Sequence, residues 1–516
     1  MNGWTIVRPL LCFALAAVLV STAEAQLIDR TLAPNIANEG IAKSLPQQVG
    51  AGRGDLYTPG SSQFLIARDP FRSIRRGRQL FQRKFTHAQG QGPVVQDGVG
   101  DVNQILAIGA GLSDSCAGCH GRPRGSAGFG GDVVTRPDSR DAPHLFGLGL
   151  KEMLADEITS ELRAIRDEAL AAARASGRPT TRALASKGIA YGSITAAPDG
   201  SLDTGAVRGV NSDLRVRPFF AHGGKIAIRE FVVGALNDEM GLVASDPDLA
   251  LAASGSKTTT PAGMVMDGSL DSFAVPPNGP DEIDPALVDH LEFYLLNYFK
   301  PATYEQTQRT ARGRKIFDRI GCATCHIPDL PLKRDRRVAD VETIFDPDQG
   351  SFNGLFATAT PLFHIFDDQR GFAPLKSPKG GAFLVKNIFT DFKRHDLGSN
   401  FYERNYDGTT RTEFLTTPLW GVGTTPPYGH DGRSINLTEV ILRHGGEALA
   451  QANAFERLPD EERSAVLDFL NSLVLFPPDD TASNLNPANR LDPRYPQSGH
   501  GSIKLGVLFN DPTDPE

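Results

Sequence analysis

Two copies of one five-residue motif constrain this chain more than any other feature. Cys-Ala-Gly-Cys-His stands at 116–120 and Cys-Ala-Thr-Cys-His at 322–326. Of the five cysteines, Cys12 lies in an N-terminal apolar run, so the motifs use the other four and leave none for a structural disulfide. A zinc site would need closely paired motifs, and a redox pair would need a thioredoxin-like context. Neither requires a histidine directly after the second cysteine, twice.

The motif has the spacing of covalent haem attachment. Two thiols add to the vinyl groups of one haem within a single turn of chain, which leaves the histidine that follows free to bind the iron. We therefore predict two covalently bound haems c, with His120 and His326 as iron ligands. The residues that attach them are Cys116, Cys119, Cys322 and Cys325.

The N-terminal segment predicts export. Residues 10–20 are apolar, Arg8 precedes them, and Ala23-Glu24-Ala25 supplies the small residues of a signal-peptidase site. The apolar run is shorter than the ~20 residues that span a bilayer as a helix. We expect residues 1–25 to be a signal peptide and the protein to be periplasmic, with no membrane span; a retained N-terminal anchor is the alternative. Haem is normally attached to such motifs on the outer side of the bacterial inner membrane, which agrees with export.

The charge of the chain argues against two classes of partner. The formal net charge is −8 and the basic residues are spread along the chain rather than clustered. Neither nucleic acid nor an anionic membrane surface is therefore indicated as a partner. Gly (53) and Pro (36) together make up about a sixth of the chain, below the level of low-complexity sequence. We expect many ordered loops around helices.

The surroundings of the two motifs are repeated. Arg-Gly-Arg-Gln-Leu-Phe at 76–81 matches Arg-Gly-Arg-Lys-Ile-Phe at 312–317, and amphipathic runs at 285–299 and 461–473 follow the two motifs. We predict a mainly α fold of two tandem cytochrome c-like domains, each enclosing one covalently bound haem, with long loop insertions.

The expected organisation follows from these landmarks, with a domain boundary near Lys300-Pro301. Residues 151–175 are rich in Ala, Glu and Arg and predict a helix, interpreted as a solvated face, whereas 254–280 are rich in Ser, Thr, Gly and Pro and predict a loop. The expected ranges are a signal peptide at 1–25, an N-terminal extension at 26–69, an N-terminal cytochrome c-like domain at 70–300, a C-terminal one at 301–476 and a tail at 477–516.

Several segments near the C-terminus carry a family resemblance. Residues 417–420, 427–433 (Pro-Tyr-Gly-His-Asp-Gly-Arg) and 437–441 resemble the C-terminal signature of bacterial di-haem cytochrome c peroxidases and of the related di-haem oxidoreductases. Residues 147–150 and 390–398 are similar to segments of the latter group, so the resemblance covers about 70 to 475. It implies an enzyme in which the C-terminal haem relays electrons and the N-terminal haem binds hydrogen peroxide.

The resemblance also implies partners. They are a small cytochrome or copper protein as electron donor, and hydrogen peroxide or a small oxidisable molecule as substrate. In the peroxidases a calcium ion lies between the domains, bound partly by backbone oxygens near the signature. Thr425 and Pro427 stand at the corresponding places here, and carbonyl-rich oxygen sites suit Ca²⁺.

A difference from the peroxidases predicts the second ligand of the C-terminal haem. The C-terminal unit contains no methionine, and the position that holds the Met ligand in the peroxidases, fourteen residues after the His430 equivalent, is His444 here. The resemblance thus implies ligation by His326 and His444, with a lower reduction potential than a His/Met pair would give. His430 is then a candidate for a supporting role behind the ligands or between the haems, or a loop histidine that caps a turn.

The candidate catalytic residue at the N-terminal haem is Glu239. Residues 219–224 and 233–241 resemble the peroxidase segment in which an FFWDG-type loop leads into a helix that ends in Glu-Met. Such a glutamate can take a proton from bound peroxide and return it to the leaving oxygen. The chain departs from the family at Ala221, where the relatives have a Trp between the haems, and Trp420 is the only Trp after the signal segment.

Two function classes remain open. One is the peroxidase-like oxidoreductase with Glu239 over the reactive iron. The other is a di-haem electron-transfer cytochrome without substrate chemistry, in which Met240 closes the sixth position of the first iron. Adjacent residues on a helix point about 100° apart, so Glu239 and Met240 cannot both occupy that position.

The first prediction concerns haem stoichiometry. Denatured protein should still carry two covalently held haems, because thioether bonds survive unfolding, and replacing Cys322 or Cys325 should leave one. Haem staining of denatured protein together with a pyridine haemochrome assay measures this. Haem that is lost on denaturation, or bound zinc, would refute the assignment of the motifs.

Overall fold

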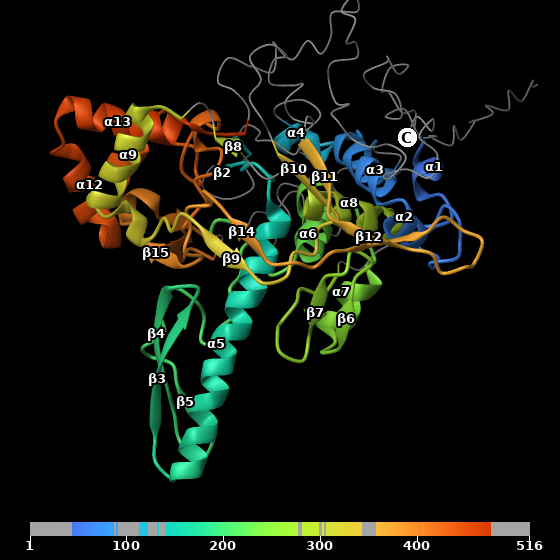
Figure 1. Ribbon diagram of the computed structural model, residues 1–516, viewed down its shortest axis with the longest axis horizontal. Coiled ribbons are helices and arrows are strands. Elements are labelled where there is room, and N and C mark those ends of the chain that lie inside the picture. The colour runs from blue at the N-terminus through green and yellow to red at the C-terminus, as the bar shows by residue number, and fades with distance from the viewer. Residues whose placement is uncertain are drawn as a thin grey trace, which may run out of the picture.

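The computed structural model describes residues 44–86, 89–90, 113–121, 132–133, 140–276, 281–298, 302–303, 306–342, 358–405 and 407–475. The expected signal peptide, the whole C-terminal tail at 477–516 and the boundary at Lys300-Pro301 lie outside these residues. Within them more residues are in helices than in strands, which confirms the mainly α prediction (Figure 1). No helix of the described part is both long and apolar enough to cross a membrane.

The helices vary widely in length, while the strands are short and pair mostly as two-stranded antiparallel ladders. The helices are α1 (Leu45–Val49), α2 (Ser62–Arg68), α3 (Pro70–Gln82), α4 (Cys116–His120), α5 (Leu148–Ser176), α6 (Ile228–Met240), α7 (Pro247–Ala253), α8 (Pro285–Asn297), α9 (Gln308–Arg319), α11 (Leu437–Arg443), α12 (Leu449–Glu456) and α13 (Asp460–Asn471), with 3-10 turns η3 (Cys322–Thr324), η4 (Ser399–Phe401), η5 (Val422–Thr424) and η6 (Gly446–Ala448). The strands are β1 (Asp132–Val133), β2 (Arg140–Asp141), β3 (Thr180–Ser186), β4 (Ile189–Ala196), β5 (Leu202–Asp203), β6 (Lys257–Thr259), β7 (Val265–Asp267), β8 (Ala302–Thr303), β9 (Leu330–Leu332), β10 (Ala339–Glu342), β11 (Thr358–Pro361), β12 (Phe363–Phe366), β13 (Leu375–Pro378), β14 (Phe383–Val385), β15 (Arg394–Asp396), β16 (Glu403–Arg404), β17 (Thr410–Arg411), β18 (Glu413–Leu415) and β19 (Leu473–Val474).

Local sequence determines where several helices begin. The Asp284 carboxylate accepts a hydrogen bond from the Ala286 amide at the start of α8, and Thr307 and Thr310 form a reciprocal capping box at the start of α9. Helix α13 opens with three acidic residues, 460–462, which interact favourably with the positive end of the helix dipole. These signals place the helices that frame each motif.

The internal repeat appears as two crossing helix pairs. Helix α3 packs on α8 at one end of the molecule, and α9 packs on α13 at the other (Figure 1). The repeated glycine lies at each crossing. A Cβ atom on Gly77 would stand 2.2 Å from the His290 carbonyl oxygen, and one on Gly313 would stand 1.9 Å from the Ala465 carbonyl oxygen. Only glycine allows the helices to approach so closely, which explains why this residue recurs in both copies.

The contacts at the crossings refine the sequence match. The Cβ of Tyr294 lies under Gly77, and the Cβ of Phe469 lies under Gly313. The equivalent positions in space are therefore Tyr294 and Phe469. The sequences Leu-Glu-Phe-Tyr at 291–294 and Leu-Asp-Phe-Leu at 467–470 would instead pair Phe293 with Phe469. The register of the closing helices is shifted by one residue from the sequence match.

An arm formed by α5 and the sheet of β3, β4 and β5 extends away from the body (Figure 1). The helix expected at 151–175 is confirmed, but its interpretation as a solvated face was wrong. One side packs into the first core, and Ala169 and Ala173 pack against Ala196 of β4. Part of the loop expected at 254–280 is likewise a short hairpin, β6 with β7.

Two hydrophobic cores organise the body. The second core comes from the C-terminal helices and includes Ile316, Phe455 and Phe469. The first core extends beyond the N-terminal unit, because Leu330 and Phe392, which follow the second motif, belong to it. Strand β8 pairs with β19, so the described chain enters and leaves the second unit at neighbouring points.

The second prediction tests the glycine at the first helix crossing. Gly77→Ala should lower the free energy of unfolding by about 1–3 kcal/mol, because the added methyl meets a backbone carbonyl that cannot rotate away. Gly234→Ala is the matched control. Gly234 lies in α6, and a Cβ atom added there would stand 4.0 Å from its nearest neighbours. That variant should gain about 0.5–1 kcal/mol from better helix propensity. Denaturant unfolding followed by circular dichroism measures both, and equal effects would contradict the close approach.

Candidate functional site

The first motif forms the short helix α4. Ser115 caps it, with its hydroxyl accepting a hydrogen bond from the Gly118 amide at 3.1 Å. His120 follows the second cysteine, and its Nδ1 donates to the Pro143 carbonyl oxygen at 2.8 Å. Desolvation by the surrounding protein lowers the pKa of His120. A neutral imidazole whose Nδ1 carries the proton presents the Nε2 lone pair, which is the form that binds iron.

The second motif repeats this arrangement. The turn η3 holds Cys322, and the His326 amide donates to the Cys322 carbonyl at 3.0 Å. The Nδ1 of His326 donates to the Phe389 carbonyl oxygen at 3.1 Å. Desolvation lowers the pKa of His326 to about 4. In both motifs the histidine is oriented by its Nδ1 hydrogen bond, and burial favours the neutral imidazole, in which Nε2 carries a lone pair.

The cysteines fit covalent attachment of haem. All four are free thiols, and all four keep part of their surface uncovered although protein surrounds the motifs. Thiols that lie within the protein but keep part of their surface open leave room for a large attached group such as haem. Together with the two oriented histidines, the residues present fit haem at both motifs.

The structure brings His444 close to the second motif. His444 follows the last residue of α11, and its Nδ1 donates to the Val440 carbonyl oxygen at 2.7 Å. Its ring packs edge-on against Phe401, with ring centres 5.4 Å apart. Its charge, if present, would lower the pKa of His326, so the two imidazoles lie within electrostatic range. Burial also lowers the pKa of His444, which thus shares with His120 and His326 an Nδ1 hydrogen bond and an environment that favours the neutral imidazole.

Three other residues could in principle bind an iron at the second motif, but one is exposed and two are engaged in hydrogen bonds. His364 is exposed on β12. The Tyr428 hydroxyl donates to the Val422 carbonyl oxygen at 2.8 Å. Both ring nitrogens of His395 are occupied, at 2.9 Å from an Asp391 oxygen and 2.8 Å from a Glu447 oxygen.

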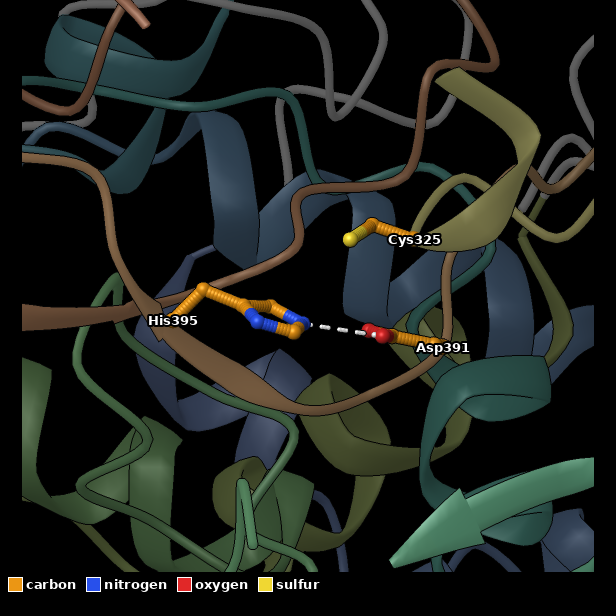
Figure 2. A group of neighbouring side chains, drawn as sticks. All are labelled: Cys325, Asp391 and His395. Carbon is orange, nitrogen blue, oxygen red and sulfur yellow. Dashed lines mark hydrogen bonds and ion pairs between the residues drawn. The ribbon is translucent and has the colours of Figure 1, made fainter. Parts of the chain in front are cut away.

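His395 also belongs to a group that resembles a metal site. Cys325, Asp391 and His395 are the one group of three potential ligands that converges within the described ranges (Figure 2). Burial opposes a charge on His395, but the Asp391 carboxylate, with Glu447, raises the pKa of the imidazole to about 11. A protonated imidazole has no lone pair for a metal. Asp391 and His395 therefore form an ion pair beside Cys325 of the second motif.

His430 lies where the two units meet. Its ring stacks on Phe414 with centres 4.0 Å apart, and its carbonyl oxygen accepts a hydrogen bond from the Asp141 amide at 3.1 Å. Nearby, Arg140 forms a salt bridge of 2.5 Å with Glu403. Desolvation lowers the pKa of His430 to about 4. The expected calcium residues Thr425 and Pro427 precede it; the Thr425 hydroxyl donates to the Gly421 carbonyl oxygen at 3.2 Å.

Glu239 and Met240 end α6, as the resemblance predicts. Burial raises the pKa of Cys119, and the Glu239 charge adds to the shift, so Glu239 lies near the first motif. Met240 is only 3% exposed and packs in the first core. The preceding loop reaches the second unit, because the Ala221 carbonyl oxygen accepts from the Leu415 amide at 2.8 Å.

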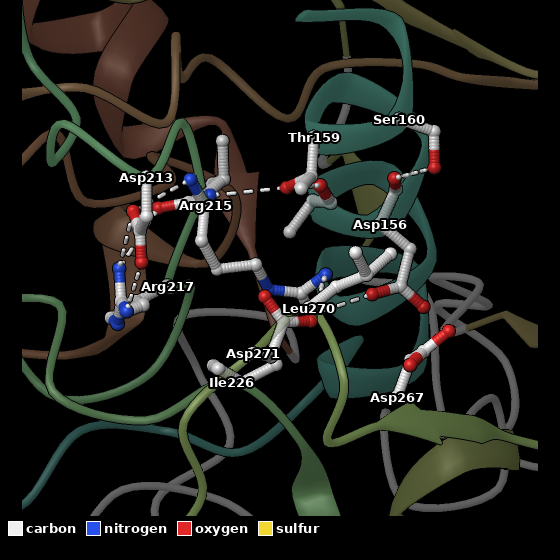
Figure 3. Close-up of polar contacts among 12 residues, drawn as sticks. Asp156, Thr159, Ser160, Asp213, Arg215, Arg217, Ile226, Asp267, Leu270 and Asp271 are labelled. Atoms are coloured by element: carbon white, nitrogen blue, oxygen red, sulfur yellow. Dashed lines mark hydrogen bonds and ion pairs between the residues drawn. The ribbon is translucent and has the colours of Figure 1, made fainter. Parts of the chain in front are cut away.

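A polar cluster connects residues 213–217, which precede this loop, to α5 (Figure 3). Arg215 donates to Asp156 at 2.8 Å and lies 3.6 Å from Asp271, and the Thr159 hydroxyl accepts from the Val216 amide. The small cavity beside it is lined by arginines that include Arg215. Because Arg215 already has carboxylate partners, the cluster is structural.

Sequence reasoning missed His144 and the placement of Trp420. His144 directly follows Pro143, the partner of His120, and a Cβ atom built on the nearby Gly147 would stand 2.7 Å from the Trp420 ring. A signal was present, since Pro143 and Gly147 flank an aromatic segment much as Pro418 and Gly421 do. That parallel identifies equivalent segments, but it does not reveal that they touch.

Comparisons with known proteins support the resemblance. Residues 360–473 match the family model described as "Di-haem oxidoreductase, putative peroxidase". This match confirms the predicted resemblance to the di-haem oxidoreductases and implies haem cofactors. No curated protein matches the chain.

Seventeen chains of solved structures match. Hydrazine synthase of Kuenenia stuttgartiensis, under xenon pressure, aligns over 82% of this chain and 94% of its own with 13% identity and a TM-score of 0.33. A MauG-like protein associated with microbial copper homeostasis aligns over 54% of this chain and 76% of its own, with 13% identity and a TM-score of 0.25. Both TM-scores are below 0.5, so no conclusion about the fold rests on them.

The third prediction concerns His444. His444→Ala should convert one low-spin haem to high-spin or raise its potential through a substitute ligand, because the iron loses a nitrogen donor. Electron paramagnetic resonance and a redox titration measure this. His364→Ala is the control, and its exposed side chain should leave both haems unchanged. If His444→Ala leaves the spectrum intact, another residue is the ligand.

Proposed function

We propose that the chain is an exported di-haem c-type cytochrome that acts as a peroxidase-like oxidoreductase. In this proposal the C-terminal haem relays electrons to a reactive N-terminal haem. The observation that carries it is the asymmetry between the two motifs. The second has a neutral histidine, His444, near its proximal histidine, whereas the first has a carboxylate, Glu239, near its cysteines.

The C-terminal site supports electron relay. His326 and His444 both hold their Nδ1 proton on a backbone carbonyl, so both can offer Nε2 to the same iron. With both histidines bound, the iron would exchange electrons and would have no position left for substrate. These properties favour electron transfer over binding chemistry.

The N-terminal site supports proton transfer. When bound, haem supplies iron that accepts single electrons and offers a position for peroxide. The chain would supply the rest: His120 would hold the iron, and Glu239 would take a proton from peroxide and return it to the leaving oxygen. Glu239 stands at the C-terminal end of α6, and its charge contributes to the raised pKa of Cys119, which supports this role.

The alternative is an electron-transfer cytochrome with Met240 on the first iron. In the structure the Met240 side chain is buried in the first core, together with apolar residues such as Leu236 and Leu242. This packing accounts for Met240 without a bond to iron, which is why we favour the enzyme.

The proposal includes partners and location. The donor is a small cytochrome or copper protein in the periplasm, and the oxidant is hydrogen peroxide, with a small oxidisable molecule as the alternative substrate. A calcium ion held by oxygens at Thr425 and Pro427 is part of the proposal.

The fourth prediction decides between the two functions. Glu239→Gln keeps the size of the side chain but removes its ability to accept a proton. Peroxide reduction with a reduced donor protein should fall by about 10² to 10⁴, the loss expected when acid–base catalysis is removed, while both haem spectra stay unchanged.

Met240→Leu is the paired variant. If Met240 only packs, this volume-conserving change should cost little stability and leave activity intact. If Met240 binds the iron, the first haem should become high-spin. Unimpaired turnover in Glu239→Gln together with an altered spectrum in Met240→Leu would leave an electron carrier.

A further inference from the structure

The segment that follows His444 is attached to the end of strand β15. The Gly445 amide donates to the Leu397 carbonyl oxygen at 2.8 Å, and a carboxylate oxygen of Glu447 accepts from the Asp396 amide at 3.1 Å. These bonds join the three residues after His444 to a segment that lies about fifty positions earlier in the chain. The position of His444 therefore depends on that earlier segment.

The two segments approach each other too closely for side chains. A Cβ atom on Gly446 would stand 2.2 Å from the Asp396 carbonyl oxygen, and Gly446 has a φ of 49°, in the left-handed region. On the other segment, a Cβ atom on Gly398 would stand 3.1 Å from the Gly446 amide nitrogen. The backbone contact behind His444 thus requires glycine on both sides.

The residue before His444 is also fixed. Arg443 donates to both carboxylate oxygens of Asp431, at 2.7 and 3.3 Å, and to the Asn400 carbonyl oxygen at 2.8 Å. Its guanidinium lies 4.4 Å from the centre of the Phe401 ring, against which the His444 ring packs. His444 is therefore held by contacts both before and after its own position.

His395 connects this arrangement to the support of His326. Its Nδ1 donates to Glu447 at 2.8 Å, and its Nε2 donates to Asp391 at 2.9 Å (Figure 2). Ionised carboxylates only accept hydrogen bonds, so both ring nitrogens of His395 carry protons. Asp391 stands two residues after Phe389, whose carbonyl oxygen accepts the bond from His326. The segments that orient the two histidines are thus joined through one imidazole.

We propose that the ion pair of His395 and Glu447 keeps His444 from leaving the iron bound by His326. The pair lies between the segment that orients His326 and the segment that carries His444, so it fixes the separation of the two imidazoles. His395 and Glu447 are positioning residues, because they act through His444. The inference rests on the proposed ligation by His326 and His444.

The exposure of the two side chains sets the expected size of the effect. The His395 side chain is 8% exposed and that of Glu447 is 57% exposed. A fully exposed ion pair contributes little to stability, whereas a shielded hydrogen bond to a charged group contributes more. For this half-shielded bond, we expect its loss to raise the population with dissociated His444 by about tenfold.

The test measures the rate at which carbon monoxide binds to the second haem of the fully loaded, reduced protein. Carbon monoxide can bind there only after His444 leaves, so the rate rises with the dissociated population. Stopped-flow absorbance in the Soret region records the binding phases of both haems. His444→Ala identifies the phase of the second haem, because the loss of the ligand makes that phase fast.

Glu447→Gln is the central variant. The amide oxygen can still accept from the Asp396 amide, but the amide nitrogen cannot accept from His395. The rate should rise about tenfold, while electron paramagnetic resonance of the oxidised protein should still show a low-spin second haem. Glu439→Gln is the matched control, since Glu439 is an exposed carboxylate in α11 that accepts from the Ile435 amide at 3.0 Å. This control should keep the natural rate.

Gly446→Ala tests the same contact without a change of charge. Its added methyl group meets the Asp396 carbonyl oxygen, which should separate the two segments and raise the rate. Gly408→Ala introduces similar backbone strain at a φ of 80°, but its added atom meets nothing within 4 Å and should leave the rate unchanged. This pair of variants also provides the test if Glu447→Gln does not load the second haem.

A double variant shows whether His395 and Glu447 act through one bond. His395→Gln should also raise the rate. Glu447→Gln combined with His395→Gln should bind carbon monoxide no faster than the faster single variant, because both changes remove the same bond.

The outcomes are distinct. A natural rate in Glu447→Gln, equal acceleration in Glu439→Gln, or additive effects in the double variant would overturn the proposal while His444→Ala still accelerates binding. Unchanged binding and spectra in His444→Ala would show instead that His444 is not the ligand. That result would remove the proposed relay site, and this inference with it.

Discussion

The hydrogen bond from an imidazole Nδ1 to a backbone carbonyl is the interaction on which the rest of this structure depends. His120, His326 and His444 each make one, to Pro143, Phe389 and Val440. Each bond fixes the tautomer and the ring orientation, so that one nitrogen remains for iron. Two of the acceptors, Pro143 and Phe389, lie in irregular segments, whereas Val440 lies in α11. Loops therefore orient the two motif histidines, and a helix orients His444.

The two units share this plan and differ in what surrounds it. Both have a helix pair that crosses at a glycine, Gly77 or Gly313, with an aromatic residue under it. The first unit adds the arm of α5 and its sheet, and it recruits Leu330 and Phe392 from beyond the second motif into its core. A duplicated framework has thus come to support unequal sites, with a second histidine near one motif and a carboxylate near the other.

Local patterns predicted the parts of the molecule that depend on local sequence. The motifs, the repeated glycine segments and the closing helices could be identified because each is set by a few adjacent residues. The inner side of α5 could not, because its small residues Ala169 and Ala173 are meaningful only once β4 lies against them. Leu419 and Trp420 pack in different cores, and no short window of sequence contains that information. The neighbourhood of Glu239 was predicted by family resemblance alone.

The pairing of β8 with β19 has a consequence for how such a chain can change over time. Leu473 lies beside Thr303, so the second unit begins and ends at one place. Because the two ends of the unit meet, sequence can be added before or after it without changing the path of the chain inside it. Lengthening of the flanking sequence, such as the stretches on either side of this pairing, therefore leaves the architecture of the C-terminal unit intact.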